Sequence, residues 1–486
     1  MLKIVKFIFQ IAIGFLLSAI VSTLATAIDF PSREIPFRNL PIPAGTLSHA
    51  AASPGATGAG DPFYPLMGNG GYEVEHYTID LAVDANRNFI EGTATLEINT
   101  TQNLSEFNLD FLGLEIEEIQ IDGTRADFRR EGSELTVIPA TSLAAQTKFT
   151  ATVRYSGIPT PIRDPAIPIP LGWQTGSEGI FVVSQPSGSM SWYPVNNHPT
   201  DKATYSFRIT VPKPLVVAAN GVLEETIDNG DTTTYLWQMR YPMASYLATV
   251  NIGKLQRQDD PRSASVPIRN YFPAGTPPET IAAFGPTSEM MDFYSELLGP
   301  YPYDVYGVVV VGPELGGNAL ETQSLSAFGS YATSETLVAH ELVHQWLGNH
   351  VTVKYWPDIW LNEGFATYLP LLWVEHRYGK EALNDAMGQM YAELERFRVG
   401  PPAQIAISEM FGPSVYRRGA WTLHALRLQV GDETFFEILK TYYQRFAGGY
   451  VTTDDFLAVV NEVSDRDLRA FLSAWLYEEP LPLAGS

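Results

Sequence analysis

Apolar and polar residues alternate along the first half of the chain. The longest runs place apolar residues at every second position, in Tyr77–Val83, Ala94–Ile98 and Tyr205–Val211. A period of two, with turn residues between the runs, is typical of antiparallel strands. Such strands continue to about Leu255, and the pattern therefore predicts an antiparallel β-sandwich domain over residues 71–256.

A different pattern begins after about Gln256. A strand is expected at Val305–Val311, and helical periodicity then dominates from Ser334 to Leu476. We therefore predict an α+β multidomain chain in which residues 257–486 form a second, mainly helical domain. The clearest helical segments are Ala382–Phe397, Thr434–Phe446 and Asp454–Val463, the last of them behind the cap candidates Thr452 and Thr453.

The N-terminus has the order of residues found in export signals. Lys3 and Lys6 precede an apolar run, and the small-residue triplet Ala25-Thr26-Ala27 follows it. This order predicts a signal peptide over residues 1–27 and an exported protein, periplasmic or extracellular. An uncleaved membrane anchor through residues 7–24 is the alternative, because the run approaches the roughly 18–20 residues that span a bilayer.

Residues 28–70 separate this apolar run from the first predicted strand. They are rich in Pro, Gly, Ala and Ser and show no sustained period. Such a composition predicts a linker or a loosely draped arm without regular structure of its own.

Composition narrows the classes of function. The chain has 486 residues, no cysteine and a formal net charge of −23 at pH 7. Disulfides, lipoprotein anchoring and thiol catalysis are excluded, because each of them needs cysteine. Nucleic-acid binding is disfavoured, because phosphate contacts need an excess of Lys and Arg. A solvated acidic surface explains the charge without a cationic partner.

The stretch LVAHELVHQWLGNH, residues 337–350, is predicted to be helical. Thr333 or Ser334 can cap the start and Gly348 can end it, so the helix should cover Glu335–Leu347. On a helix, residues four apart share one face, with Cβ atoms roughly 5–6 Å apart. Two side chains at that spacing can therefore bind one metal ion.

Two histidines have this spacing. His340 and His344 can both reach a zinc ion, and Glu341 lies about 100° around the helix from His340. Glu341 can therefore approach a water at the metal without binding the metal itself. A chance match in a buried helix, with both imidazoles hydrogen bonded in a core, is the alternative. A third ligand would decide between them.

A candidate third ligand lies in WPDIWLNEGFATYL, residues 356–369. Asp358 can cap a second helix that carries Glu363, and eighteen residues separate His344 from Glu363. Two histidines and one carboxylate are the donor set of a catalytic zinc site. An exposed glutamate favoured by the helix dipole is the alternative for Glu363, although its neighbours Trp360 and Phe365 are apolar.

These motifs resemble those of a known family. HELVH followed by the glutamate of NEGFA is similar to the gluzincin zinc aminopeptidases of the aminopeptidase N and leukotriene hydrolase family. The stretches KATYSF, SYLATVNIG, VYRRGA and DLRAFLSAWL extend this similarity from about Gly71 to Leu476. The resemblance implies a saddle-like β domain, a thermolysin-like catalytic domain, one Zn²⁺ on His340, His344 and Glu363, and Glu341 as the general base.

The resemblance also implies residues that contact the substrate. The family's amine-recognition motif, usually Gly-Ala-Met-Glu-Asn, is similar to residues 318–322, although three of the five positions differ. Its glutamate falls on Glu321 and its alanine on Ala319. The family's transition-state tyrosine falls on Tyr416 in VYRRGA. Gln185, in FVVSQPSGS, resembles the glutamine that the β domain sends into the site.

The activity implied by the resemblance is hydrolysis of the N-terminal peptide bond of peptides with a free N-terminus. The altered amine motif leaves open an endopeptidase or an epoxide hydrolase on the same zinc site. A non-catalytic adaptor with the same fold is a further alternative, although such an adaptor would be expected to have lost one of the site residues. The preferred N-terminal residue and the oligomeric state are not indicated.

Two features depart from the family's pattern. The sequence ends about ten residues past AFLSAWL, so the expectation is a short form without the family's C-terminal helical domain and with a more open cleft. Pro370 lies inside the predicted helix of Glu363 and should bend or end it. His350 and His424 lie outside the motif and are not expected to bind the metal.

Overall fold

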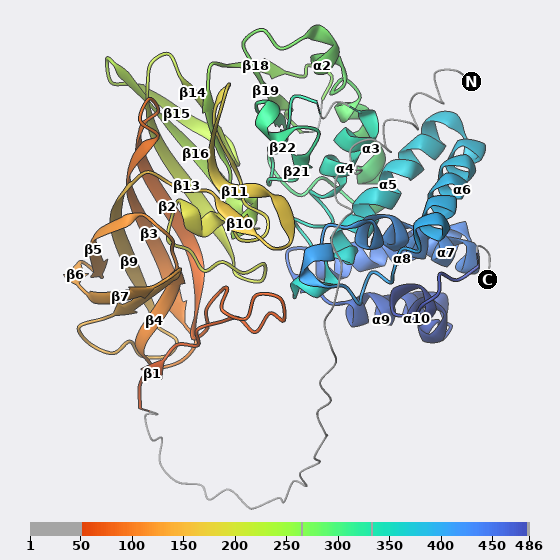
Figure 1. Cartoon of the computed structure of the whole chain (residues 1–486), viewed down its shortest axis with the longest axis horizontal. Helices are drawn as coiled ribbons and strands as arrows, with labels where there is room; N and C mark the ends of the chain where they lie inside the picture. Colours follow the sequence, from red (N-terminus) through yellow and green to blue (C-terminus); the bar gives the residue numbers. More distant parts are fainter. Residues whose placement is uncertain (1–50, 264–265, 332–333, 484–486) are drawn as a thin grey trace, which may run out of the picture.

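The computed structural model describes residues 51–263, 266–331 and 334–483. Figure 1 shows a β-rich part formed by the first half of the chain and, beside it, a mainly helical part formed by the second half. The predicted signal peptide over residues 1–27 and the alternative anchor over residues 7–24 lie outside the described residues. Within the described ranges, no helix is both long and apolar enough to cross a membrane.

An eight-stranded sheet forms the larger part of the β domain, in the order β15-β16-β13-β2-β3-β9-β5-β6. Along β2 the side chains of Tyr77, Ile79 and Leu81 are buried and alternate with more exposed ones, as the period of two predicted. Neighbouring strands are antiparallel, except that β2 and β13 run parallel. The strands are β2 (Tyr72–Asp84), β3 (Phe89–Thr100), β5 (Glu115–Ile121), β6 (Thr124–Arg125), β9 (Lys148–Gly157), β13 (Lys202–Pro212), β15 (Val222–Asp228) and β16 (Thr232–Ala244).

Two smaller sheets complete this domain, in the orders β10-β11-β12-β17-β14 and β1-β4-β8-β7. Trp192 connects the layers, because its ring contacts both Trp173 of β11 and Phe207 of β13. The predicted fold class, a β domain followed by a helical domain, is thereby confirmed. The strands are β1 (Ser53–Pro54), β4 (Leu104–Asp110), β7 (Asp127–Glu131), β8 (Glu134–Ile138), β10 (Ile162–Asp164), β11 (Ile167–Gly176), β12 (Gly179–Val183), β14 (Val216–Ala219) and β17 (Val250–Gly253).

The described part of the predicted arm, residues 51–70, contacts both domains. Its strand β1 pairs in parallel with β4 of the β domain. Asp61 is buried, and its Oδ2 accepts a hydrogen bond of 2.7 Å from the main-chain N–H of Trp356 in the second domain. Composition alone gave this segment no structure, because Pro, Gly and Ala do not reveal contacts with distant parts of the chain.

The second domain begins with a five-stranded sheet in the order β18-β19-β20-β22-β21. The strand expected over Val305–Val311 is β20, which covers only Val308–Val310. The other strands are β18 (Leu255–Asp259), β19 (Arg269–Pro273), β21 (Ala319–Leu320) and β22 (Ser326–Phe328), with a small separate pair of β23 (Thr352–Val353) and β24 (Tyr450–Val451).

Helices follow the sheet and cover residues close to those predicted from periodicity. The expected segments correspond to α6, α8 and α9, each within two residues at both ends. The helices are α2 (Pro278–Ala282), α3 (Thr287–Leu298), α4 (Glu335–Val343), α5 (Trp360–Tyr378), α6 (Lys380–Phe397), α7 (Gly419–Val430), α8 (Asp432–Phe446), α9 (Thr453–Ser464) and α10 (Arg469–Leu476).

Helix α5 is the central helix of this domain and packs against α4, α6 and α7. Its first half is buried on all sides. Gly364 of α5 lies against Gly419 at the start of α7, and a Cβ atom built on Gly364 would be 3.0 Å from the carbonyl carbon of Gly419. Because neither residue has a side chain, the two helix backbones approach directly.

Predicted capping residues are found at the N-terminal ends of α4 and α9. Ser334 caps α4, since its Oγ accepts a hydrogen bond of 3.2 Å from the N–H of Leu337. Thr452 caps α9, where it forms a reciprocal capping box with Asp455. Both predictions are confirmed. The predicted end of α4 at Leu347 is wrong, because after Val343 the backbone tightens into a turn with bonds between residues three apart.

Asp358 does not cap α5, so that prediction is wrong. Asp358 lies in a short 3₁₀ turn, η4 (Trp356–Asp358), and the N-cap residue Ile359 has no side chain that could accept a hydrogen bond. The carboxylate of Asp358 instead accepts hydrogen bonds from the N–H and the hydroxyl of Thr453, at 3.2 and 2.6 Å. Asp358 therefore bonds Thr453, which is 95 residues away in the sequence, and does not cap the helix that follows it.

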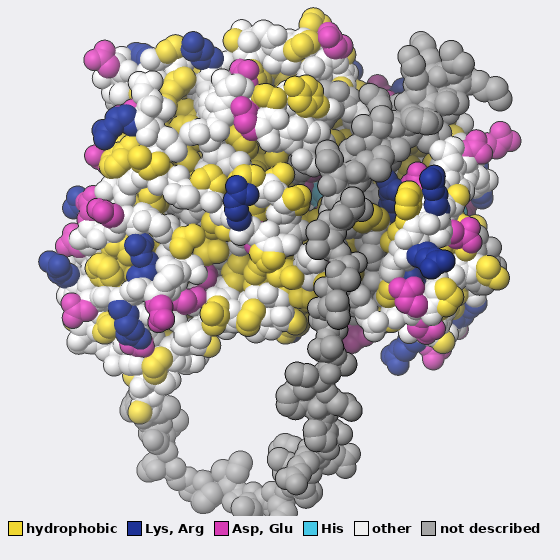
Figure 2. Space-filling model, in the orientation of Figure 1, with side chains coloured by type: hydrophobic (Ala, Val, Ile, Leu, Met, Phe, Trp, Pro, Cys, Tyr) yellow, Lys and Arg dark blue, Asp and Glu magenta, His cyan; other side chains and the backbone are white. Residues whose placement is uncertain are grey.

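Charged side chains are spread over the molecular surface. Figure 2 shows acidic and basic side chains intermingled across the face in view. Several form exposed ion pairs, such as Arg129 with Glu106 and Arg445 with Glu462. The excess of acidic residues is therefore distributed among mixed charges on this face.

Candidate active site

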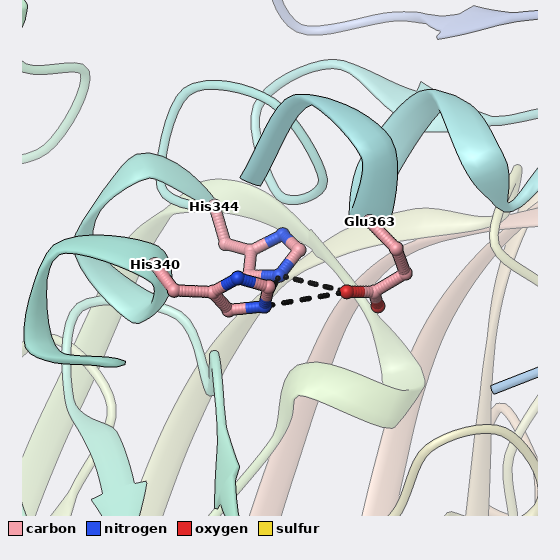
Figure 3. Close-up of side chains that lie close together, drawn as sticks. All are labelled: His340, His344 and Glu363. Carbon is pink, nitrogen blue, oxygen red and sulfur yellow. Dashed lines mark hydrogen bonds and ion pairs between the residues drawn. The ribbon is translucent and has the colours of Figure 1, made fainter. Parts of the chain in front are cut away.

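His340 on α4, His344 directly after the end of α4 and Glu363 on α5 point toward a common centre (Figure 3). The Nε2 atoms of His340 and His344 lie 3.1 Å apart, and they lie 3.4 and 3.3 Å from Oε2 of Glu363. The side chain of Glu363 is 2% exposed and that of His344 is 1% exposed. His344 is the C-cap of α4 and still has helical backbone angles, so the spacing of four residues places both imidazoles on one face, and α5 supplies the third donor.

Main-chain groups orient the two imidazoles. Nδ1 of His344 lies 3.1 Å from the carbonyl oxygen of Leu347, so this nitrogen carries a proton and Nε2 is the ring nitrogen that faces the centre. The turn that provides this carbonyl leaves no room for a side chain at Gly348, where a Cβ would lie 2.7 Å from Nδ1 of His344. The early end of α4 therefore places the carbonyl of Leu347 where it orients the imidazole of His344.

Pro370 affects the other imidazole. Of the two predicted effects, bending or ending the helix, the second does not occur, because α5 continues through Pro370 to Tyr378. A proline has no N–H to donate to the carbonyl four residues earlier, which here belongs to Ala366. The main chain of Ala366 hydrogen bonds His340 instead. The carbonyl freed by the proline thus helps to orient a residue of the triad.

The electrostatics of the centre favour a cation. Burial acts to raise the pKa of Glu363, but the nearby imidazoles of His344 and His340 hold it at about 2. Burial acts to lower the pKa of His344, but the charges of Glu363 and Glu321 raise it to about 10. With Glu341 also buried, three carboxylates adjoin two imidazoles. A divalent metal ion would balance this excess of negative charge.

The donor set fits zinc in a catalytic site. Zinc accepts imidazole nitrogen and carboxylate oxygen, and catalytic zinc sites use three protein donors where structural sites use four. Oε2 of Glu363 has no hydrogen-bond partner among the described residues, although it is buried between the two histidines. A buried oxygen of this kind is normally satisfied, and a bound metal would satisfy it.

Glu341 is buried next to His340 on α4. Its Oε2 has no hydrogen-bond partner in the described part of the chain. Burial raises the pKa of Glu341 well above its ordinary value, the charges of Glu321 and Glu363 raise it further, and His344 opposes this rise. A carboxylate with high proton affinity beside a metal centre is suited to accept a proton from water.

Tyr416 lies in a π-helical turn, η6 (Ser414–Arg418), directly before α7. Its ring stacks on the imidazole of His340, with centroids 5.9 Å apart and planes 9° from parallel. Burial, and then the charges of the nearby carboxylates, raise the pKa of the phenol well above its ordinary value. The phenol therefore stays protonated and can donate a hydrogen bond. π-Helical turns are frequent at functional sites.

Gln185 and Glu321 meet from different domains. Nε2 of Gln185, which follows β12, donates a hydrogen bond of 2.9 Å to Oε1 of Glu321, which follows β21. Both residues are buried, at 6% and 2% exposure. Burial raises the pKa of Glu321 to about 7, while the charge of His344 opposes the rise. Ala319 lies two residues before Glu321, at the start of β21 and opposite Phe328.

Sequence reasoning missed the residues that hold Glu321. Its carbonyl oxygen accepts hydrogen bonds from Nε2 of Gln345 at 3.2 Å and from Nδ2 of Asn349 at 2.7 Å. It also missed Tyr246, whose hydroxyl donates to the carbonyl of Gly348 at 3.3 Å. A signal was present for two of them, because Gln345 and Asn349 lie within the HELVHQWLGN stretch.

His350 and His424, which were not expected to bind the metal, each form a hydrogen bond with a tyrosine hydroxyl. Nδ1 of His350 lies 2.8 Å from the hydroxyl of Tyr443, and Nδ1 of His424 lies 3.1 Å from that of Tyr368. Neither histidine is in the cluster of potential metal ligands, which consists of His340, His344 and Glu363 in the described residues.

Comparison with known proteins identifies the family. Residues 73–247 match the peptidase M1 N-terminal domain and residues 282–475 match the peptidase family M1 domain. A crystal structure of the M1 zinc metallopeptidase from Deinococcus radiodurans is 32% identical, with a TM-score of 0.83, over 88% of this chain and 99% of that one. The chain belongs to peptidase family M1. This confirms the resemblance seen in the motifs.

Other M1 relatives define how far the similarity extends. A mutant of the Deinococcus M1 enzyme bound to a Tyr-Ser-Ala substrate has the same identity, TM-score and coverage. Aminopeptidase M1 of Arabidopsis thaliana is 25% identical over 328 residues, which are 62% of this chain and 37% of that protein. The chain spans about half or less of the length of such curated relatives. The M1 zinc metallopeptidase structures and the histidine-histidine-glutamate triad together support one zinc ion per chain.

Proposed function

We propose that this M1 protein is a zinc aminopeptidase, which hydrolyses the N-terminal peptide bond of peptides with a free N-terminus. One observation carries the proposal: Glu321 is buried beside the His340, His344 and Glu363 triad, and its side chain is bonded by the neutral amide of Gln185. A buried carboxylate whose side-chain partner is a neutral amide has no counter-charge there, so binding of a cation beside it is favoured. The α-ammonium group of a peptide supplies that cation.

Glu341 is the general base in this proposal. Zinc, when bound, supplies a Lewis acid that makes a water more acidic and polarises the scissile carbonyl. Glu341 accepts the proton of the attacking water and passes it to the leaving amine, a role worth roughly 10²–10⁴ in rate. Its burial beside the triad and its unpartnered Oε2 support this assignment, because within the described residues no hydrogen bond occupies that oxygen and it can accept a proton.

Tyr416 stabilises the negative charge that develops on the carbonyl oxygen. Its protonated phenol donates a hydrogen bond to that oxygen, and the stacking of the ring on His340 fixes its position beside the triad. Such a donor acts mainly in the transition state, so it raises kcat more than it improves substrate binding.

Glu321 and Gln185 determine where the peptide is cut. Glu321 binds the α-ammonium, Gln185 orients the carboxylate, and Ala319 lines the neighbouring part of the site. Because the ammonium is fixed at a set distance from the triad, the first peptide bond is the one that meets Glu341. An endopeptidase cuts away from the free N-terminus and would not need a buried carboxylate that binds an α-ammonium.

The experiment compares amino-acid anilides with a free or an acetylated N-terminus, with and without a zinc chelator. We expect cleavage of the free forms alone and its loss with chelator. Cleavage of both forms would favour an endopeptidase, and cleavage of neither would favour the non-catalytic adaptor. Epoxide hydrolysis is assayed in parallel with a lipid epoxide.

Three variants assign the roles. Glu341→Gln should keep one zinc per chain and lose turnover by at least about 10². Glu321→Ala should weaken the preference for free over acetylated substrates. Glu296→Gln, an exposed glutamate of α3, is the matched control and should leave both properties unchanged. Retained turnover in Glu341→Gln would refute the assignment of the base.

We further propose that the protein is exported. Lys3, Lys6, the apolar run and the triplet Ala25-Thr26-Ala27 support a signal peptide. Cell fractionation and N-terminal sequencing of the mature protein test this proposal. A mature N-terminus after Ala27 is expected, whereas an intact N-terminus in the membrane fraction would indicate an anchor through residues 7–24.

A further inference from the structure

Lys202 is a lysine of the β domain whose ammonium contacts only main-chain carbonyls of the other domain. It is the first residue of β13. Its Nζ donates to the carbonyl oxygens of Asn349 at 3.1 Å, His350 at 3.0 Å and Gly449 at 2.9 Å. An ammonium group has three N–H donors, and each has an acceptor here. The contacts therefore fix both the lysine and the turn that follows α4.

Asn349 links Lys202 to Glu321 through hydrogen bonds. Asn349 is fully buried, and its Nδ2 donates a hydrogen bond of 2.7 Å to the carbonyl oxygen of Glu321. Its own N–H donates to the carbonyl of His344 at 2.9 Å, so the residue is also tied to the turn of a triad histidine. A shift of Asn349 would therefore move the main chain of Glu321 relative to the triad.

Two routes from the β domain thus converge on one carboxylate. Gln185 bonds the side chain of Glu321 directly. Lys202 reaches its main chain through Asn349. The first contact orients the carboxylate group, and the second sets the position of the residue that bears it.

We propose that Lys202 is a positioning residue for Glu321, and that it acts through Asn349 to hold the α-ammonium site in register with the triad. The inference rests on the proposed function, in which Glu321 binds the free N-terminus. If Lys202 has this role, the preference for peptides with a free N-terminus depends on the contact between the β domain and the catalytic domain. Lys202 itself does not contact the substrate.

A purely structural tie between the domains would behave differently. Its loss would lower thermal stability and affect all ligands equally. A positioning role affects ligands with a free amine more than blocked ones, and its effect disappears when Glu321 no longer binds the amine. A double-mutant cycle of Lys202 and Glu321 therefore distinguishes a positioning role of Lys202 from a purely structural one.

The experiment measures binding of Tyr-Ser-Ala and of N-acetyl-Tyr-Ser-Ala to zinc-loaded Glu341→Gln protein by calorimetry, with zinc content and thermal unfolding recorded for each variant. Lys202→Met removes the three donors and keeps the length of the side chain. Lys213→Met is the matched control, because Lys213 follows the same strand but is exposed and pairs with Asp228.

We expect Lys202→Met to weaken binding of the free peptide by about tenfold, to leave the acetylated peptide unchanged, and to keep one zinc per chain. In a Glu321→Ala background, Lys202→Met should cause no further loss. Lys213→Met should behave as the parent protein.

Other outcomes overturn the inference in distinct ways. If Lys202→Met and Glu321→Ala weaken binding by factors that multiply, or if free and acetylated peptides lose equally, Lys202 is only a structural tie. If Glu321→Ala alone leaves the preference for the free peptide intact, the proposed function fails first. If Lys202→Met does not fold, Lys202→Gln, which retains two donors, is put through the same cycle and read in the same way.

Discussion

Gln185 and Glu321, 136 residues apart in sequence, are joined by a hydrogen bond of 2.9 Å from Nε2 to Oε1. One residue follows a strand of the β domain and the other follows a short strand of the catalytic domain. Because both are buried, this contact forms only when the two domains meet. The candidate substrate site is therefore shared between domains, and the metal triad is not.

Removal of this contact should weaken substrate binding. We expect Gln185→Leu to raise KM for free N-terminal substrates by about tenfold, the size expected for a hydrogen bond to a charged group, with little change in kcat. Steady-state kinetics measure both constants. Gln174→Leu, a half-buried glutamine of β11 that bonds the carbonyl of Pro170, is the control. An unchanged KM in Gln185→Leu would remove Gln185 from the substrate site.

The phenol of Tyr416 should act in the transition state. Tyr416→Phe keeps the ring stacked on His340 but removes the hydroxyl, so we expect kcat to fall by about 10²–10³ with KM and zinc content unchanged. Tyr331→Phe changes an exposed tyrosine, 73% accessible, and should have no effect. A rise in KM at constant kcat would instead assign Tyr416 to ground-state binding.

The contact between Gly364 and Gly419 should tolerate no side chain. Gly364→Ala puts a Cβ at 3.0 Å from the Gly419 carbonyl carbon, which forces α5 and α7 apart and shifts Glu363 relative to Tyr416. We expect a loss of about 1–3 kcal/mol in the free energy of unfolding, together with weaker zinc binding. Chemical denaturation and zinc titration measure the two effects.

Gly388 provides the opposite case. It lies in α6, and a Cβ built there meets no atom within 4 Å. Gly388→Ala should therefore stabilise the protein by about 0.4–1 kcal/mol, because alanine loses less conformational entropy on folding. Equal effects of the two glycine substitutions would show that crowding between α5 and α7 is not what matters at Gly364.

A partly buried ion pair should contribute to stability. Arg427 of α7 is 5% exposed and forms two hydrogen bonds with Glu375 of α5, at 2.6 and 3.1 Å. Glu375→Gln leaves a buried charge with only Asp432 as its counterion, so we expect a loss of about 2–3 kcal/mol in unfolding free energy. Glu289→Gln breaks the exposed pair with Arg377 and should cost less than about 1 kcal/mol. Equal losses in denaturation would contradict this difference.

Two carboxyl groups should make stability depend on pH. Asp110 and Glu134 face each other across β4 and β8. Burial raises the pKa of Glu134 to about 7, and burial, with the charge of Glu134, raises that of Asp110 to about 8. Both groups hold protons more tightly in the folded state than in the unfolded one. Their stabilising contribution is therefore complete below about pH 4 and is lost as pH rises toward 8.

Glu134→Gln should reduce this dependence. The neutral amide does not ionise, and the charge that opposes ionisation of Asp110 is gone. We expect the variant to have a higher Tm than the parent at pH 8 and a smaller advantage at pH 5. Thermal unfolding across this range measures the slope, and an unchanged slope would show that Glu134 does not contribute.

Local spacing was sufficient for the parts of the site that lie on one helix. His340 and His344 share a face because residues four apart always do so on a helix, and the caps at Ser334 and Thr452 follow from bonds within one turn. The assignments of Tyr416, Glu321 and Gln185 came from resemblance and remain predictions as to role. The structure adds that Tyr416 stacks on His340 and that Gln185 hydrogen bonds Glu321.

Tertiary structure decided everything that depends on distant partners. Asp358 bonds Thr453 in place of its own helix, α4 ends early at Val343, and Asp61 of an apparently unstructured arm bonds Trp356. Such outcomes depend on which groups are brought together when the domains pack, and neither period nor composition records that. The sequence by itself therefore determined the donors and the helices that carry them. The packing determined how Lys202, Asn349 and Gln185 hold Glu321, because those hydrogen bonds join segments that only the folded chain brings together.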